Sequence, residues 1–223
     1  MFKVAIDGPS GAGKSTIAKT VARTLGFVYI DTGAMYRTAA LACLNENVSI
    51  KKNPEKAIEI VNNISIDIDY INNEQHIFLN GCDVSDKIRT PEVSMGASDV
   101  SAIGAVREKL VNLQRELSGT KNVIMDGRDI GTHVLPDADV KIFLTASAKV
   151  RADRRYKELI EKGAQVLYED VLADIIKRDR QDETREASPL KQASDAVLAD
   201  TSELTFDESV ALVLDLINNK RSV

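Results

Sequence analysis

The segment from Gly8 to Thr16 constrains the fold of this chain more than any other part of the sequence. It reads Gly-Pro-Ser-Gly-Ala-Gly-Lys-Ser-Thr and fits the pattern G-x-x-x-x-G-K-[S/T]. A strand-like apolar run, Val4–Ile6, precedes it. After it, Ile17, Val21 and Leu25 recur every four residues, as on one face of a helix. A glycine-rich turn that only caps a helix is the simpler alternative, but the strand–loop–helix context favours a functional loop.

These residue types suit the binding of a polyphosphate. Glycines let backbone N–H groups converge on an anion without a Cβ in the way, and the N-terminus of the following helix adds its positive dipole end. Lys14 is expected to neutralise the β- and γ-phosphates, and the Ser15 hydroxyl to ligate Mg²⁺. The predicted ATP-binding residues of this segment are Gly8, Pro9, Ser10, Gly11, Ala12, Gly13, Lys14, Ser15 and Thr16.

Along the rest of the chain, apolar strands alternate with helical patterns, which predicts an α/β fold with a parallel sheet and helices on both faces. Five core strands are expected near Phe2–Asp7, Phe27–Ile30, Val123–Met125, Val140–Leu144 and Ala196–Leu198. The main helices are expected near residues 14–25, 34–44, 103–117, 146–162, 168–185 and 206–218. Shorter helices should begin at Asn53-Pro54 and Thr90-Pro91, where a capping residue precedes proline. Thr32 is a plausible N-cap for 34–44, and Thr205 with Glu208 forms a capping box.

Between the second and third core strands the hydrophobic period changes. Ile64, Ile66 and Ile68 alternate with polar residues, Asn72-Asn73 predicts a turn, and Asn80-Gly81 predicts a tight hairpin. This pattern predicts a small antiparallel three-stranded sheet inserted into the parallel α/β domain. The insert could form one wall of a cleft, or it could only stabilise the domain.

Composition restricts the function further. The chain has 223 residues, which suits one domain with an inserted lobe, and its net charge of −5 does not suggest a general nucleic-acid-binding surface. Cys43 and Cys82 lie in unrelated contexts, so we expect reduced thiols, a cytoplasmic location and no structural zinc. We expect no leader peptide and no membrane association, because no long apolar run or basic leader precedes the first strand.

Charged residues gather at the expected strand ends and on two helices. Asp126 ends the third core strand and could assist Mg²⁺ directly or through water, or simply end a strand. Next in the chain, Arg128 could bind a phosphate and Asp129 an exocyclic amine, or the two could form a structural ion pair. Helical spacing places two further sets each on one helix face: Arg151, Arg154 and Arg155, and Arg178, Asp182 and Arg185. The two sets could form a lid over phosphates or a solvated surface with ion pairs.

Taken together, these segments resemble the bacterial cytidylate kinases, P-loop nucleoside monophosphate kinases, over residues 1 to about 215. The matching segments are Ile6–Thr16, Asp31–Arg37, Val106–Glu108, Asp126–Thr132, Leu135–Ala138, Arg154-Arg155, Arg178-Asp179, Arg185 and Ser188–Leu190. The resemblance implies a three-layer α/β/α fold with a five-stranded parallel sheet. It also implies one domain with a core of residues 1–58, 100–148 and 190–223, an acceptor-binding insert near 59–99 and a helical lid near 149–189.

The resemblance also implies roles for individual residues. Thr32, Arg107 and Asp129 resemble the residues that read the cytosine edge, and Tyr36, in the Asp31–Arg37 segment with Thr32, is also expected to bind the substrate. The residues that hold the acceptor phosphate correspond to Arg37, Arg128 and Arg178, those near the ribose to Asp182 and Arg185, and those of the lid to Arg151, Arg154 and Arg155. Lys14, Arg128 and Arg178 would be catalytic. Many relatives carry Ser where this chain has Thr32, and the added methyl group could alter the fit to the base.

The expected activity is therefore transfer of the γ-phosphoryl group of ATP, with Mg²⁺, to CMP and dCMP by a monomeric enzyme. Such a transfer needs positioning and charge stabilisation rather than a protein nucleophile. A P-loop kinase for another nucleotide or a sugar-like alcohol is a second hypothesis, in which Asp126 or Asp129 would serve as the base. A nucleotide-dependent switch is a third. The sequence has no Asn-Lys-x-Asp guanine-binding motif, and a protein that only binds a nucleotide would not need the two arginine-bearing helix faces.

Overall fold

The computed structural model describes residues 1–71, 74–161 and 163–222. Contacts between residues divide the chain into two compact units. The first, which we call the core unit, consists of Met1–Tyr29 and Lys121–Val223, and the second, the inserted unit, is Ile30–Thr120. The predicted insert, residues 59–99, falls within the inserted unit.

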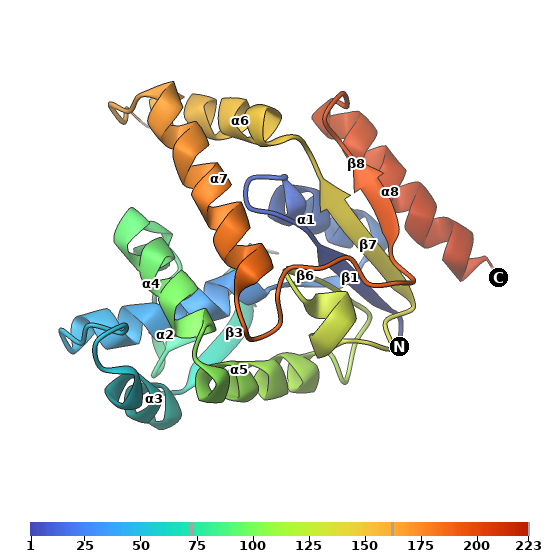
Figure 1. The fold of residues 1–223 in the computed structure, drawn as a ribbon. Coiled ribbons are helices and arrows are strands. Elements are labelled where there is room, and N and C mark those ends of the chain that lie inside the picture. The colour runs from blue at the N-terminus through green and yellow to red at the C-terminus, as the bar shows by residue number, and fades with distance from the viewer. Residues whose placement is uncertain (72–73, 162, 223) are drawn as a thin grey trace. The chain divides into compact units, whose positions relative to one another are not determined.

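A five-stranded parallel sheet with the order β2-β6-β1-β7-β8 forms the centre of the core unit (Figure 1). Its strands are β1 (Lys3–Asp7), β2 (Val28–Asp31), β6 (Val123–Gly127), β7 (Val140–Thr145) and β8 (Val197–Asp200). In the parallel register of β1 and β6, Ile6 lies opposite Asp126 and Asp7 opposite Gly127. The predicted α/β fold with five parallel strands is thus confirmed, and the acidic ends of β1 and β6 lie side by side.

The helices of the core unit pack around two apolar clusters. Val21 of α1 and Val213 of α8 are fully buried in the larger cluster, together with Val4 and Ile6 of β1. A smaller cluster lies between α6 and α7, which contact each other and are drawn at an angle in Figure 1. The elements concerned are α1 (Lys14–Leu25), the single π-helical turn η2 (Ile130–Val134), α6 (Ala148–Glu161), α7 (Tyr168–Thr184) and α8 (Phe206–Arg221).

The inserted unit combines helices with the small antiparallel sheet that the sequence predicts. The sheet has the order β3-β4-β5, and Asn80 and Gly81 both have positive φ, 50° and 79°, as a tight hairpin requires. The predicted turn at Asn72-Asn73 lies outside the described residues. The elements are α2 (Thr32–Asn45), α3 (Pro54–Asn63), β3 (Ile66–Ile71), β4 (Glu74–Leu79), β5 (Cys82–Asp83), the 3₁₀ turn η1 (Lys87–Arg89), α4 (Pro91–Ser101) and α5 (Gly104–Leu117).

Most predicted helix starts are confirmed, but one is wrong. Thr90 accepts a hydrogen bond from the backbone N–H of Val93, and Thr205 forms the predicted capping box. Thr32, in contrast, is the first residue of α2, and the Asp31 carboxylate caps the helix by accepting from the N–H of Ala34 at 2.8 Å. Asp31 takes this place because the strand β2 continues to it and the helix begins at the next residue.

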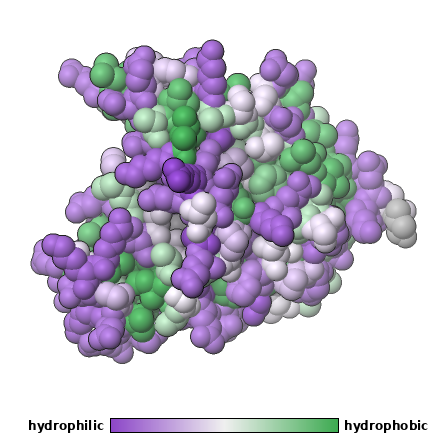
Figure 2. All heavy atoms as spheres, viewed as in Figure 1, coloured by the Kyte–Doolittle hydropathy of each residue, from purple (hydrophilic) through white to green (hydrophobic). Residues whose placement is uncertain are grey.

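In the space-filling view, hydrophilic residues cover most of the visible face and apolar residues form scattered patches (Figure 2). Cys43 is buried and Cys82 exposed, and both are free thiols. Within the described ranges, the helices are too short or too polar for any of them to pass through a bilayer.

Candidate functional site

The loop between β1 and α1 has the backbone that its sequence predicts. Gly8, Gly11 and Gly13 have φ of 148°, 75° and 85°, values that glycine tolerates and other residues rarely adopt. Gly8 also passes so close to β7 that a Cβ built on it would lie 1.9 Å from the carbonyl oxygen of Leu144. The loop leads directly into the N-terminus of α1, whose N-cap is Gly13. Free backbone N–H groups and the helix dipole therefore favour an anion there.

The Lys14 side chain is enclosed by this loop. It is buried, and Nζ donates a hydrogen bond of 2.7 Å to the carbonyl oxygen of Pro9. Burial, followed by the positive charge of Arg128, lowers the pKa of Lys14 well below its usual value. A phosphate bound in the loop would supply the negative charge that this buried cation lacks.

The Ser15 hydroxyl and the Asp126 carboxylate lie together at the start of α1 and the end of β6. Ser15 Oγ donates to Asp126 Oδ2 at 2.8 Å, and the Tyr29 hydroxyl donates to Oδ1 of the same carboxylate at 2.8 Å. Among the described residues no group of three or more His, Cys, Asp or Glu side chains could hold a metal ion by itself. One hydroxyl with one carboxylate nevertheless fits Mg²⁺, which usually keeps several waters and takes its remaining ligands from a substrate phosphate.

Asp7 fixes the segment that follows β6. Its two carboxylate oxygens accept hydrogen bonds of 2.7 Å from the backbone N–H groups of Ile130 and Gly131. Burial raises the pKa of Asp7 to about 6, although both hydrogen bonds act in the opposite direction. Asp7 was not among the predicted site residues. Its position at the end of a strand, directly before Gly8, is the signal that could have revealed it.

Four of the predicted acceptor-binding residues lie together in the core unit. Arg128 Nε donates to Asp182 Oδ2 at 2.7 Å, and Arg185 Nη2 lies 3.7 Å from Asp129 Oδ1. Burial raises the pKa of Asp182, but the positive charges of Arg128, Arg178 and Arg185 outweigh it and hold that pKa below its usual value. The loop after β6 and the helix α7 therefore form one charged cluster, and the charge of Arg178 contributes to it.

The three arginines predicted on α6 point to different partners. The Arg151 guanidinium is buried and binds the carbonyl oxygens of Ala146 and Ser10 and the carboxylate of Asp179. Arg154 Nη2 donates to the carbonyl oxygen of Thr201 at 2.8 Å. Arg155 is exposed and pairs with Glu158 on its own helix. The helical spacing of these three residues therefore did not bring their guanidinium groups to one place.

The predicted residues of the inserted unit lie in the first two turns of α2 and the first turn of α5. Arg37 Nη2 donates to Asp31 Oδ2 at 2.9 Å. The guanidinium carbon of Arg107 lies 5.7 Å from the ring centre of Tyr36, within the range of a cation–π contact. Arg107 and Thr32 are both buried. Within this unit, Arg107 thus lies against Tyr36, and Arg37 is held by Asp31.

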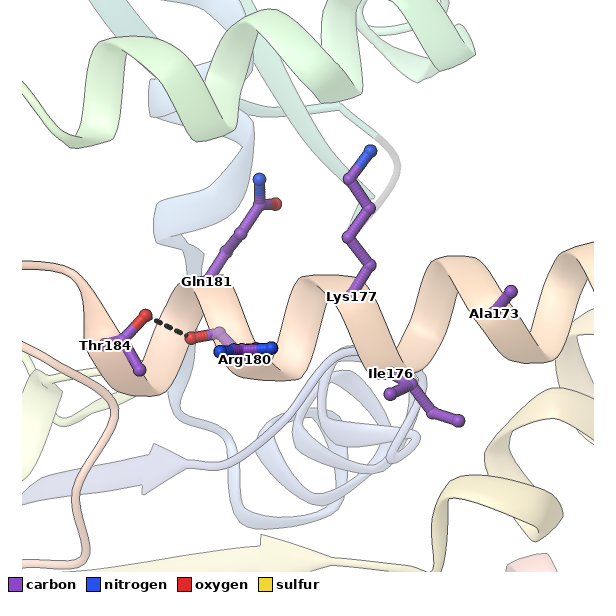
Figure 3. A pocket seen from close by; sticks show the side chains of 6 residues that line it. All are labelled: Ala173, Ile176, Lys177, Arg180, Gln181 and Thr184. Carbon is purple, nitrogen blue, oxygen red and sulfur yellow. Dashed lines mark hydrogen bonds between the residues drawn. The ribbon is translucent and has the colours of Figure 1, made fainter.

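A cavity of about 540 Å³ lies along one face of α7 (Figure 3). Its lining includes Ala173, Ile176, Lys177, Arg180, Gln181 and Thr184. None of these is a predicted site residue. In the close-up, Gln181 and Lys177 extend to one side of the helix, while the Thr184 hydroxyl donates to the carbonyl oxygen of Arg180. The phosphate loop and the charged cluster, rather than this helix face, carry the chemistry described above.

Comparison with known proteins identifies the family. The family model described as cytidylate kinase matches residues 4–219. The chain belongs to the cytidylate kinase family. The cytidylate kinase of Caldicellulosiruptor bescii is 54% identical over 215 residues, 96% of this chain and 95% of that protein. Those of Lactobacillus johnsonii and Bacillus cereus are 51% and 50% identical, over 99% and 97% of this chain and 96% of each of those proteins. The resemblance stated from the motifs is therefore confirmed.

Solved structures support the fold of this cytidylate kinase family member. An uncharacterized protein from Eubacterium ventriosum aligns over 98% of the chain and 99% of its own length, with a TM-score of 0.56 and 11% identity. The shikimate kinase of Bacteroides thetaiotaomicron aligns over 97% of the chain and 98% of its own length, with a TM-score of 0.51 and 14% identity. At these identities the likeness extends to the fold alone.

Proposed function

We propose that the chain transfers the γ-phosphoryl group of ATP to CMP and dCMP, which gives ADP and the cytidine diphosphates. The observation that carries this proposal is the alignment with proteins named cytidylate kinase, at about half of all residues identical over nearly the whole chain. The phosphate loop and the arginines near it supply the groups that such a transfer needs.

On the donor side, the backbone N–H groups of residues 8–16 and the ammonium group of Lys14 bind the phosphates of ATP. Lys14 moves from the Pro9 carbonyl to the phosphates, where its charge is balanced. Ser15 and Asp126 would hold Mg²⁺, which neutralises charge on the β- and γ-phosphates when it is bound. The lid residues Arg151, Arg154 and Arg155 are assigned to the donor side as well, and Arg154 must leave Thr201 to reach a nucleotide.

On the acceptor side, Arg37, Arg128 and Arg178 bind the phosphate of CMP. Arg37 and Arg128 are both hydrogen-bonded to carboxylates, to Asp31 and Asp182, so an incoming phosphate competes for guanidinium groups that are already oriented. The base is assigned to Thr32, Arg107 and Asp129, with Tyr36 beside them, and the ribose to Asp182 and Arg185. The acceptor oxygen is anionic at pH 7, so no general base is required.

Closure of residues 59–99 and 149–189 over the two nucleotides would exclude water and suppress hydrolysis of ATP. We further propose a monomer in the cytoplasm that acts in pyrimidine nucleotide metabolism and binds neither nucleic acid nor membranes. The free thiols Cys43 and Cys82 and the net charge of −5 support this part of the proposal.

A steady-state assay of ADP release with ATP–Mg²⁺ tests the proposal against CMP, dCMP, UMP, AMP, GMP and a sugar-like alcohol. We expect turnover with CMP and dCMP to exceed that with the purine nucleotides. Turnover of the alcohol without turnover of CMP would favour a kinase for another acceptor, and slow GTP hydrolysis without any acceptor would favour a switch. Failure of every pyrimidine monophosphate would exclude the proposed function.

Replacing Arg128 tests the acceptor site itself. Arg128→Ala should lower kcat by about a thousandfold, because an arginine that stabilises the transferring phosphoryl group typically contributes that much. Arg23→Ala removes an exposed arginine from α1 and is the matched control, with activity expected within twofold of the parent. Near-normal activity of the Arg128→Ala variant would overturn the role assigned to Arg128.

A further inference from the structure

Arg151 is anchored by protein groups on several sides. Its Nε donates to the carbonyl oxygen of Ala146 at 2.8 Å, and Nη1 donates to the carbonyl oxygen of Ser10 at 2.9 Å. Nη1 and Nη2 also donate hydrogen bonds to the two carboxylate oxygens of Asp179, at 2.9 and 2.6 Å. The Arg151 side chain is only 5% exposed, so these contacts are made away from water. Such a two-pronged, desolvated pair has a fixed geometry.

This pair connects α7 to the phosphate loop. Ser10 belongs to the loop, Arg151 to the first turn of α6, and Asp179 to α7. The loop backbone also packs on this connection, because a Cβ built on Gly11 would lie 3.4 Å from Arg151 Cβ and 3.8 Å from Ile175 Cδ1. Contacts with Arg151 of α6 and Ile175 of α7 therefore fix the position of the loop at Ser10 and Gly11.

A second carboxylate of α7 acts in a similar way. Asp182 lies three residues after Asp179 and so on the same face of the helix. It holds Arg128, the residue that follows β6, at 2.7 Å. One helix face thus orients two arginines, of which one reaches the phosphate loop and the other carries the proposed acceptor contact.

We propose that Asp179 is a positioning residue for the phosphate loop: by orienting Arg151 it holds the Ser10 carbonyl and keeps the loop in the shape that binds ATP. This inference rests on the proposed function, because it assigns the loop to ATP. It differs from a role in which Arg151 contacts ATP directly and its partner is dispensable. In the positioning role, Asp179 and Arg151 act as one unit, and the loss of either has the same effect.

Four variants separate these two possibilities. Asp179→Asn keeps the size of the side chain and removes its charge. Arg151→Lys keeps the positive charge and removes the paired Nη1 and Nη2 donors. A double variant combines the two changes. Asp174→Asn, an exposed carboxylate on the same helix, is the matched control. Each protein is measured by calorimetric titration with ADP–Mg²⁺, by KM for ATP and for CMP, and by hydrogen exchange of the loop amides.

We expect Asp179→Asn and Arg151→Lys each to weaken ADP binding and to raise KM for ATP about tenfold, with KM for CMP within twofold of the parent. Amides of residues 10–13 should exchange faster, and the double variant should be no worse than either single one, because the pair acts as a unit. The Asp174→Asn protein should behave like the parent.

The inference is overturned if Asp179→Asn binds ADP and protects the loop as the parent does while Arg151→Lys does not, since Arg151 would then act without Asp179. It is also overturned if KM for CMP rises as much as KM for ATP in these variants, because the substitutions would then disturb both nucleotide sites and not the phosphate loop specifically. ADP titration and exchange need no acceptor, so they decide the point even if the parent fails to phosphorylate CMP.

Discussion

Individual residues near the phosphate loop hold charge away from water. Asp7 is 5% exposed and Lys14 is 5% exposed, and each is oriented by backbone groups rather than by an ion pair with the other. Removing charges from water is costly, and their pKa values respond: that of Asp7 is raised and that of Lys14 is lowered. The lowered pKa of Lys14 means that its ammonium group lacks a full counter-charge, which a bound phosphate would supply.

Asp7 should titrate measurably. Its pKa of about 6 in the folded chain exceeds the value of about 3.9 in an unfolded chain, so the folded state binds this proton more tightly. The contribution of Asp7 to the free energy of unfolding is therefore greatest below about pH 4 and declines as the pH rises to about 6. Carbon-13 NMR should show the pKa of the Asp7 carboxyl near 6 and that of the Asp182 carboxyl below its usual range. A midpoint near pH 4 for Asp7 would contradict the burial argument.

Gly8 should tolerate no side chain. Gly8→Ala places a Cβ against the Leu144 carbonyl oxygen at a φ of 148°, and backbone atoms cannot move aside easily. We expect the free energy of unfolding to fall by more than about 4 kcal/mol, measured by urea denaturation. Gly26→Ala is the control: its φ is also positive, 68°, but nothing lies within 4 Å of the added Cβ, so the loss should be about 1 kcal/mol. An equal loss of unfolding free energy in the two variants would show that the positive φ, and not the contact with Leu144, determines the cost.

At the scale of elements, sequence predicted what depends on near neighbours. The hairpin at Asn80-Gly81 and the cap at Thr205 were predicted because their signals lie within a few residues. The sequence did not reveal that Asp7 receives the N–H groups of a turn 123 residues away, because the sheet order that joins β1 to β6 is not visible in a local pattern. Arg151 and Arg154 likewise bind groups far away in the sequence, among them Asp179 and Thr201, whereas Arg155 pairs with a residue of its own helix.

The capping box of α8 should contribute to stability independently of the site. Thr205 Oγ1 accepts from the N–H of Glu208, and the Glu208 carboxylate accepts from the N–H of Thr205. Thr205→Ala should lower the free energy of unfolding by about 1 kcal/mol and leave KM for ATP unchanged. Glu203→Gln, an exposed change just before the helix, is the control and should be neutral. No loss of stability in Thr205→Ala would mean that water replaces the cap at no cost.

At the scale of the whole molecule, nucleotide binding should stabilise the chain through the core unit, which contains the entire phosphate loop. ADP–Mg²⁺ at a hundred times its dissociation constant should raise the free energy of unfolding by about 2.7 kcal/mol. Lys14→Met should abolish this increase, whereas the exposed change Lys19→Met on the same helix should preserve it. Thermal unfolding with and without ADP measures the effect, and a full increase in Lys14→Met would contradict the role of Lys14.

The way the chain enters and leaves the inserted unit has a consequence for how such enzymes can change. Val28 in β2 donates a backbone hydrogen bond of 2.9 Å to the carbonyl oxygen of Asn122, just before β6, so the two flanks of the inserted unit are neighbours in the sheet. The inserted unit, about ninety residues long, is therefore joined to the core unit at two adjacent points of the chain. Exchange of this segment would replace Thr32, Tyr36, Arg37 and Arg107 and leave the phosphate loop, Arg128 and Asp129 in place, so acceptor choice can change in part without loss of the donor site.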